Sequence, residues 1–287
     1  MASYTEDMKE LYSLVNKKNS LSFVIQKYLC RFENSSFAQH YEKATQKLLR
    51  ELKRKYKEEV IVSLTSHPGR IRTVATCIES LLNQSVRPTK ILLWLSTDQF
   101  PRKEADLPRN LLKLKKRPVF EIRWVEDDLA PHKKYFYAMQ EYPELPVIIT
   151  DDDVIYEKKM IEKLMNSYRA FPDCVSCMRA NLITFKTNGA LRSYDGWIMD
   201  YRILLDIPSY QLMPTGVGGV LYPPHSIPVS AFDTGAIKNT CLYADDLWLK
   251  FFAVYNGYRT VVPRDFSGYK EIPGTQETAL WKVNVHK

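Results

Sequence analysis

Short apolar runs alternate with longer amphipathic stretches along the chain after residue 58. The runs are rich in Val, Ile and Leu, as expected of strands that are buried on both faces. The first four predicted strands cover residues 60–64, 91–95, 119–125 and 147–149. Helical patterns lie between them, one ending near residue 84 and another over 133–141. This alternation predicts an α/β fold with a mostly parallel sheet and helices on both faces.

The second half of the chain continues the pattern less regularly. A helix is predicted up to about residue 170, followed by strands around 174–178, 181–187 and 259–262. Residues 188–214 are aromatic and have no clear period. Their Tyr and Trp rings suit either stacking on a sugar or packing in an ordinary core, and the pattern alone favours neither.

The first 57 residues differ from the rest because they contain helical periods and no strand pattern. We predict a helical N-terminal extension over 1–57 and an α/β domain over 58–287. Residues 41–57 carry seven Lys or Arg against two Glu. Such a basic face is equally consistent with simple exposure to solvent and with binding to an anionic membrane surface.

Composition narrows the class of protein. The net charge is +8, yet no zinc finger, aromatic RNA-binding motif or basic zipper is present, so we expect no nucleic-acid partner. No apolar run is long enough for a membrane span, and no leader opens the chain. The five scattered cysteines indicate reduced thiols and a cytoplasmic protein, with peripheral contact to the inner face of the membrane as an option. Cys174 and Cys177 lack a second pair for zinc and are interpreted as structural.

Three carboxylates, Asp151, Asp152 and Asp153, follow directly on the apolar run at 147–149. Like charges held so close repel each other, and burying them is costly unless a cation compensates. A hard divalent cation with oxygen ligands would do so, especially one that also binds phosphate. A solvated acidic turn is the simpler alternative. The position at the end of a strand, with no Lys or Arg just upstream, favours the metal site.

Two later segments also allow both a functional and a purely structural interpretation. Residues 214–220 contain three glycines, which would allow a ligand to approach the backbone closely, although the spacing is not that of a dinucleotide-binding loop. Asp245 and Asp246 begin a predicted helix, where a carboxylate can act either as a helix cap or as a general base. Next to the acidic strand end and the glycine turn, we favour the base.

Taken in order, the strand with three aspartates, the glycine turn and the Asp-Asp-Leu-Trp helix start resemble a GT-A glycosyltransferase of the family-2-like kind. Proteins of this kind build bacterial capsular polysaccharide or lipopolysaccharide. The resemblance covers roughly residues 58–270 and leaves the N-terminal extension outside it.

The resemblance implies roles for the acidic residues. Asp153 would bind Mn²⁺ or Mg²⁺, with Asp151 as a second ligand or near the ribose, and Asp152 would lie beside the nucleotide sugar. His286 is the candidate for a late histidine ligand of the metal. Asp246 would be the catalytic base, with Asp245 as its neighbour in the motif.

It also implies roles for residues in the surrounding turns. The residues matched to nucleotide-sugar binding are Thr65, Ser66, Arg70, Lys134, Gly218 and Gly219. The first three lie in the turn after the first strand, Lys134 precedes the acidic strand, and the glycines flank the donor sugar.

The leading hypothesis is therefore a metal-dependent, inverting glycosyltransferase that uses a nucleotide sugar, a UDP-sugar, and a glycan or lipid-linked acceptor. Two alternatives stay open. One is that the chain is a non-catalytic nucleotide- or glycan-binding subunit of a polysaccharide synthase. The other is that it is a metal-dependent phosphodiesterase.

Overall fold

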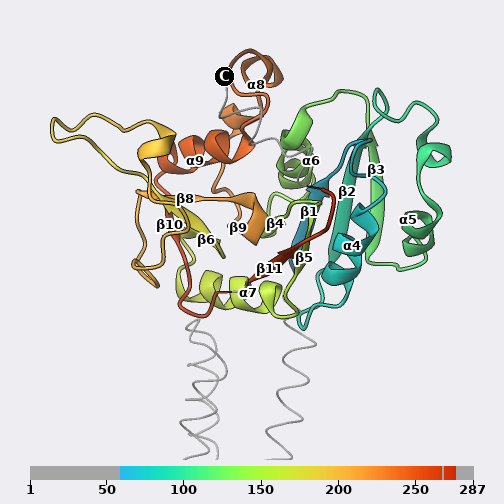
Figure 1. Ribbon diagram of the computed structural model, residues 1–287, viewed down its shortest axis with the longest axis horizontal. Coiled ribbons are helices and arrows are strands. Elements are labelled where there is room, and N and C mark those ends of the chain that lie inside the picture. Colours follow the sequence, from blue (N-terminus) through green and yellow to red (C-terminus); the bar gives the residue numbers. More distant parts are fainter. Residues whose placement is uncertain (1–58, 267, 276–287) are drawn as a thin grey trace, which may run out of the picture. The chain divides into compact units, whose positions relative to one another are not determined.

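The computed structural model describes residues 59–266 and 268–275, labelled as in Figure 1. Their core is a seven-stranded sheet with the strand order β10-β6-β9-β4-β1-β2-β3. Its strands are β1 (Ile61–Thr65), β2 (Lys90–Ser96), β3 (Phe120–Val125), β4 (Val147–Ile149), β6 (Cys174–Cys177), β9 (Val220–Tyr222) and β10 (Arg259–Val261). Strands β1 to β4 are mutually parallel, β6 is parallel to β10, and only β9 runs antiparallel to both of its neighbours. The predicted α/β fold with a mostly parallel sheet is confirmed.

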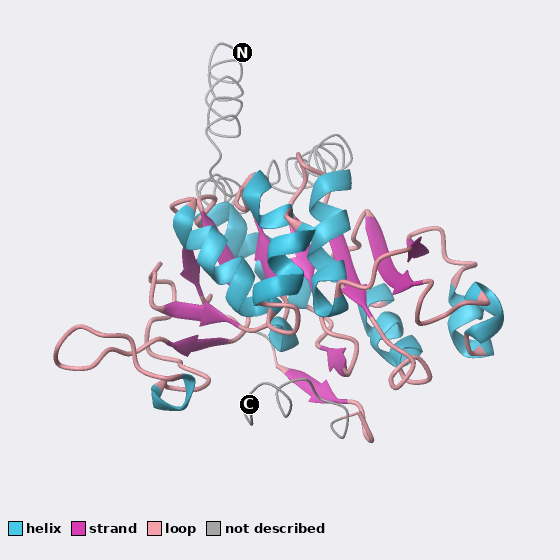
Figure 2. Ribbon diagram, turned by 90° about the horizontal axis from the view of Figure 1, so that it is seen from above, coloured by secondary structure: helices cyan, strands magenta, loops and turns pink. Residues whose placement is uncertain are grey.

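Helices cover both faces of the sheet because successive strand residues point to opposite sides. In β1, Val62 and Leu64 pack with the helices on one face, whereas Ile61 belongs to the core on the other. The first face carries α4 (Val74–Leu82), α5 (Arg109–Leu114) and α7 (Met160–Ala170), and the second carries α6 (Lys133–Glu141), α8 (Thr234–Thr240) and α9 (Asp245–Tyr255). Figure 2 shows helices lying along the strands. Short 3-10 turns occur at Lys103–Asp106, Ala130–His132, Tyr194–Gly196, Gly216–Gly218 and Val229–Phe232.

Two small ribbons complete the described chain. Strand β5 (Val154–Tyr156) pairs antiparallel with β11 (Tyr269–Glu271), and β7 (Ala180–Leu182) pairs antiparallel with β8 (Leu212–Pro214). The segment between β7 and β8, residues 183–211, is called the arm below. The strand predicted at 181–187 is wrong beyond Leu182, because only isolated bridges continue the pairing into the arm.

Most predicted elements lie within one or two residues of the observed ones, and the helix predicted over 133–141 coincides with α6. The sequence did not predict α5, α8 or β11, which are short and lack a clear period. The N-terminal extension predicted over 1–57 lies outside the described residues. No helix in the described part of the chain has both the length and the apolar character to cross a bilayer.

The topology decides where a site can form. The chain adds β2 and β3 on one side of β1 and then returns to place β4 on the other side. The loops that leave β1 and β4 therefore diverge at their carboxyl ends, which is where ligands bind in open α/β sheets. Residues 65–70 and 150–153 both lie at this edge.

Candidate functional site

The turn after β1 closes over one side of the acidic segment. Ser66 Oγ donates a hydrogen bond to Asp152 Oδ2 at 2.5 Å. Arg70 Nη1 lies 2.9 Å from Asp152 Oδ1 and 3.0 Å from Asp153 Oδ2. All four side chains are buried. This turn, with two of the predicted residues, therefore binds the acidic segment directly; Ser66, Arg70, Asp152 and Asp153 are called the Arg70 flank.

Lys134 closes the other side from the first turn of α6. Its Nζ lies 2.8 Å from Asp151 Oδ1 and 2.9 Å from Asp245 Oδ2 at the start of α9. Burial alone would lower the pKa of Lys134, but the charges of Asp151 and Asp245 raise it well above its usual value. The amine is thus held as a cation between two segments that lie more than 90 residues apart in the sequence.

Asp246 lies in the same cluster and contacts the glycine turn. Its Oδ2 accepts a hydrogen bond of 3.0 Å from the backbone N–H of Gly216. Its Oδ1 is buried and has no hydrogen-bond partner among the described residues. Burial and then the charge of Asp245 raise the pKa of Asp246 to about 7. A carboxylate with a pKa near neutrality is well matched to accept a proton. Lys134, Asp151, Asp245, Asp246 and Gly216 are called the Lys134 flank.

The site as a whole carries more negative than positive charge. It contains five carboxylates, and its cations Arg70 and Lys134 form ion pairs with four of them: Asp151, Asp152, Asp153 and Asp245. Asp245 Oδ2 also lacks a hydrogen bond within the described chain, although the Lys134 ammonium is 2.9 Å away, so that contact is an ion pair without hydrogen-bond alignment. Burial and then the Asp151 charge raise the pKa of Asp153 to about 6, against the opposing effect of Arg70. The arrangement favours a further positive charge.

A divalent cation fits this donor set in part. Among the described residues, no group of three His, Cys, Asp or Glu side chains is arranged to hold a metal ion. Mg²⁺, however, is usually bound through one or two carboxylates together with water and substrate phosphates. The site has more carboxylates than cations, so carboxylate ligands are present. The raised pKa of Asp153 shows that the negative charge around it is not fully balanced, and a bound cation would balance it. His286, the predicted additional ligand, lies outside the described residues.

In the glycine turn, the residue that borders the site is Gly216, which was not among the predicted site residues. A Cβ atom at Gly216 would lie 2.9 Å from Asp151 Oδ1 and 3.0 Å from Lys134 Nζ. The predicted Gly218 instead packs against the backbone of Arg179, and Gly219, at φ +88°, faces Met160. Gly216 is therefore the glycine that directly borders the Lys134 flank, and its place in the glycine-rich segment was the available signal.

Further residues fix the backbone of the acidic segment. The N–H of Asp151 donates to Tyr156 Oη at 2.8 Å, and the thiol of Cys77 donates to the Asp151 carbonyl at 3.2 Å. The N–H of Ile272 donates to the carbonyl of Asp153 at 2.8 Å, which brings β11 beneath the site. Cys77 and Ile272 come from segments distant in the chain, and Tyr156 lies five residues after Asp151. None of the three was predicted to support the site.

Thr65 and the cysteine pair contribute to packing. Thr65 Oγ1 donates to the carbonyl of Trp94 at 2.8 Å and so links β1 to β2. Cys174 and Cys177 are buried within β6. Three residues of a strand span about 10 Å, which is too far for a disulfide. This agrees with the structural role expected from the sequence.

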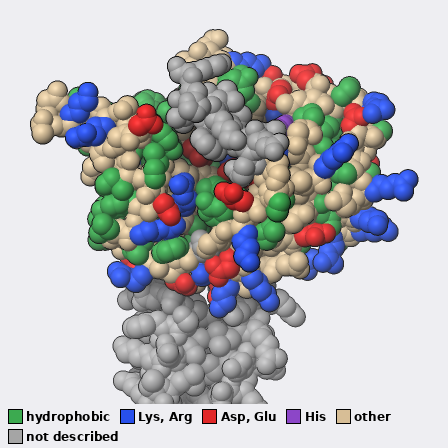
Figure 3. Space-filling model, viewed as in Figure 1, with side chains coloured by type: hydrophobic (Ala, Val, Ile, Leu, Met, Phe, Trp, Pro, Cys, Tyr) green, Lys and Arg blue, Asp and Glu red, His purple; other side chains and the backbone are tan. Residues whose placement is uncertain are grey.

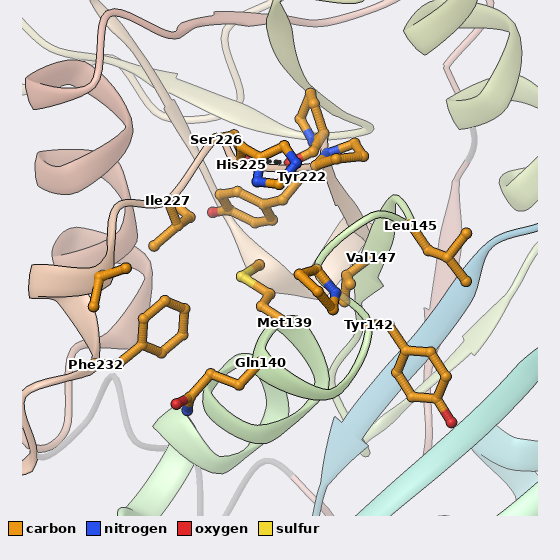
Figure 4. Close-up of a pocket in the computed structure, with 14 residues that line it drawn as sticks. Met139, Gln140, Tyr142, Leu145, Val147, Tyr222, His225, Ser226, Ile227 and Phe232 are labelled. Carbon is orange, nitrogen blue, oxygen red and sulfur yellow. Dashed lines mark hydrogen bonds between the residues drawn. The ribbon is translucent and has the colours of Figure 1, made fainter.

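A separate cavity of about 200 Å³ lies at the opposite edge of the sheet. Its lining includes Val147 at the start of β4 and Tyr222 at the end of the antiparallel β9. Figure 4 shows Met139, Tyr222, Ile227 and Phe232 around it. Because this cavity is mostly apolar and lies away from the carboxylates, we place the candidate site at the carboxyl edge.

Solved structures with a similar arrangement were found at low sequence identity. One is Staphylococcus aureus TarS 1-349 in complex with UDP, with 16% identity, 74% of this chain and 59% of that chain covered, and a TM-score of 0.49. Another is S. aureus TarS, with 16% identity, 75% and 36% coverage, and a TM-score of 0.46. Apo UDP-glucose pyrophosphorylase has 8% identity, 80% and 97% coverage, and a TM-score of 0.43.

The chain spans about 59% of the length of TarS 1-349. No family model and no curated protein matches the chain. The likenesses concern the fold at most, and the function has to be argued from the residues of the site.

Proposed function

We propose that this chain is a glycosyltransferase that transfers a sugar from a nucleotide sugar, a UDP-sugar, to a hydroxyl group of a glycan or lipid-linked acceptor. The observation that carries the proposal is the bonding of Lys134 to both Asp151 and Asp245, with Asp246 held on Gly216 beside them. Segments that resemble the donor-binding and the base-bearing motifs of GT-A enzymes thus meet in one cluster. The resemblance is also the basis for proposing a role in bacterial surface polysaccharide synthesis.

Asp151 and Asp153 are the proposed ligands for Mn²⁺ or Mg²⁺. When bound, such an ion would act as a Lewis acid that offsets the charge building up on the leaving diphosphate. Arg70 orients Asp153 through the contact at 3.0 Å. Lys134 keeps its positive charge next to Asp151 and would add to the positive potential felt by the diphosphate.

Asp246 is the proposed general base. It would take the proton of the acceptor hydroxyl as the acceptor oxygen bonds to the anomeric carbon and the bond from that carbon to the diphosphate breaks. A single displacement of this kind inverts the anomeric centre. The N-terminus of α9 favours the ionised form of Asp246, whereas burial and Asp245 favour the protonated form. The balance leaves a carboxylate that changes between its protonated and ionised forms near neutral pH.

The test is a screen of UDP-sugars for binding by thermal shift and for hydrolysis or transfer, with Mn²⁺, with Mg²⁺ and with EDTA. We expect one donor to stabilise the protein and to turn over in the presence of metal. Asp153→Ala should lose the metal requirement together with the activity, whereas Asp195→Ala, an exposed acidic control, should retain both.

Two results would contradict the proposal. Donor binding without turnover under every metal condition would favour a non-catalytic nucleotide-binding subunit. Undiminished activity in EDTA or in Asp153→Ala would exclude the metal role.

A further inference from the structure

The arm, residues 183–211, exposes an unusual amount of apolar surface. Among its most exposed aliphatic side chains are Leu191 at 56%, Ile203 at 75% and Ile207 at 51%. In all, eight of the fourteen large apolar side chains that are exposed in the described chain belong to the arm. Figure 3 shows apolar side chains gathered on one side of this face, over the region that carries the arm, β8 and β10. Apolar surface concentrated in this way marks an interaction site.

The arm is held in shape by hydrogen bonds. Thr184 Oγ1 donates to the carbonyl of Gly196 at 2.6 Å, and Trp197 Nε1 donates to the carbonyl of Arg192 at 3.1 Å. Bridges join Phe185 to Leu191 and Leu182 to Ile198. The exposed apolar side chains therefore project from an ordered ribbon, which reduces the entropy lost when they bind a partner.

The charges of the arm favour an anionic partner. Asp200 pairs with Arg202, and Asp206 pairs with Arg264. Lys186 and Arg192, near the turn at the tip, have no ion-pair partner within the described residues, and only Asp195 opposes them there. Lys186, Arg192 and Asp195 together leave a net charge of +1 near the tip, close to Leu191.

The apolar residues identify the class of partner. A glycan binds through aromatic faces flanked by hydrogen-bonding groups, whereas Leu191, Ile198 and Ile203 offer hydrocarbon alone. Aliphatic side chains beside basic ones, with Tyr194 and Trp197 as amphipathic rings, match the composition of segments that lie in a membrane interface. We propose that the arm docks on the surface of a bilayer that contains anionic lipids.

Docking would place the site near the lipid surface. The arm begins and ends at β7 and β8, and Arg179 Nη1 at its base lies 2.9 Å from Thr215 Oγ1, the neighbour of Gly216. If the chain is the proposed transferase, this location suits a lipid-linked acceptor. The docking itself does not depend on the transferase activity, and its test uses binding alone.

The experiment measures binding of the full chain to vesicles by flotation. Vesicles of phosphatidylcholine alone are compared with vesicles of equal parts phosphatidylcholine and phosphatidylglycerol. A variant with Leu191→Ser, Ile203→Ser and Ile207→Ser removes apolar arm surface. A second variant, Lys186→Gln, removes one positive charge. The matched control, Phe251→Ser with Tyr255→Ser, removes apolar side chains of similar exposure from α9.

We expect the wild type and the α9 control to bind anionic vesicles, and the triple arm variant to bind at least about tenfold more weakly. Lys186→Gln should bind anionic vesicles a few fold more weakly, since one basic residue near the surface contributes about 1 kcal/mol, roughly a fivefold change. Thermal melting confirms that each variant is folded, because the substituted side chains are exposed.

Binding of the triple variant equal to that of the wild type would overturn the proposal. So would an equal loss in the α9 control. A wild-type dimer that the triple variant converts to monomer, with no change in vesicle binding, would identify the arm as an interface between copies of the chain and would also overturn it.

Discussion

Both flanks of the acidic segment have more carboxylates than cations, but they differ in how many carboxylate oxygens have a bonding partner. On the Arg70 flank, both oxygens of Asp152 have partners, one in Arg70 and one in Ser66. On the Lys134 flank, the ammonium pairs with Asp151 and Asp245 and is also affected by the charge of Asp246. Buried oxygens of Asp245 and Asp246 have no hydrogen bond within the described chain. Asp152 therefore links the acidic segment to the turn after β1, whereas Asp245 and Asp246 each retain a buried oxygen that can accept a hydrogen bond.

This difference distinguishes carboxylates that are available for chemistry from those that are bonded within the fold. A buried carboxylate with satisfied oxygens stabilises the fold, and removing its partners is costly. A buried carboxylate with an unsatisfied oxygen and a raised pKa raises the free energy of the native state, and proteins commonly accept that cost at functional sites. The comparison predicts opposite effects on stability when Asp152 of the Arg70 flank and Asp246 of the Lys134 flank are neutralised.

Asp246→Asn should produce the largest effect. Loss of the proposed base should lower the transfer rate by about 10²–10⁴-fold. The same substitution should raise the melting temperature at pH 8, because it removes a buried negative charge while its amide oxygen can still accept from Gly216. Steady-state transfer and thermal unfolding measure the two effects. A variant that is both inactive and less stable would place Asp246 with the structural carboxylates.

Asp152→Asn tests the Arg70 flank. The substitution should lower the free energy of unfolding by about 2 kcal/mol, since it weakens charge-assisted hydrogen bonds from Arg70 and Ser66. Urea unfolding gives the value. Asp195→Asn, on the exposed arm, should change it by less than about 0.5 kcal/mol. If Asp152→Asn were as stable as the wild type, the distinction between the flanks would be lost.

Gly216→Ala tests the spacing of the Lys134 flank. The new Cβ would lie 2.9 Å from Asp151 Oδ1, so the carboxylate or the turn must move. We expect the transfer rate to fall about tenfold to a hundredfold, since small displacements of reacting groups have effects of this size. Gly268→Ala, where a Cβ meets no atom within 4 Å, is the matched control. Equal rates in both variants would show that the turn tolerates displacement.

The pH dependence of stability should differ between the wild type and Asp246→Asn. The unfolded Asp246 carboxyl titrates near 3.8, whereas its folded pKa is raised to about 7. Folded Asp246 therefore holds a proton that the unfolded chain has released, so this group makes the wild type less stable as the pH rises from about 4 to about 7. Urea unfolding at pH 5 and pH 8 should show a smaller loss in the variant. Parallel losses would mean that Asp246 titrates normally.

Tyr222→Phe should have the smallest effect. The Tyr222 hydroxyl is buried without a hydrogen-bond partner in the described chain, and burial and then the charge of Asp246 raise its pKa well above its usual value. Removing it should change the free energy of unfolding by less than about 1 kcal/mol, whereas Tyr156→Phe, which removes the acceptor of the Asp151 N–H, should cost about 1–2 kcal/mol. Thermal melting ranks the pair, and a larger loss in Tyr222→Phe would reveal a bonded hydroxyl.

The sequence predicted the location of the site better than its internal order. The alternation of strands and helices implied a mostly parallel sheet, and the rule for such sheets placed residues 65–70, 126–134 and 150–153 at one edge. The contacts of Arg70 with Asp152 and of Lys134 with Asp151 confirm that these segments meet. The roles proposed for them in binding donor and metal stay predictions.

Local hydrophobic periodicity was enough to predict most of the strands and helices, and with them the position of three carboxylates directly after a buried strand. The pairing of Asp151 with Lys134, and of Asp152 with Arg70, became known only from the folded structure. Neighbouring residues after a strand can point to opposite faces, and which helix or turn covers each face depends on strand order. The same reason explains why Gly216 and β11 could not be assigned in advance. Their partners come from segments that only folding brings together.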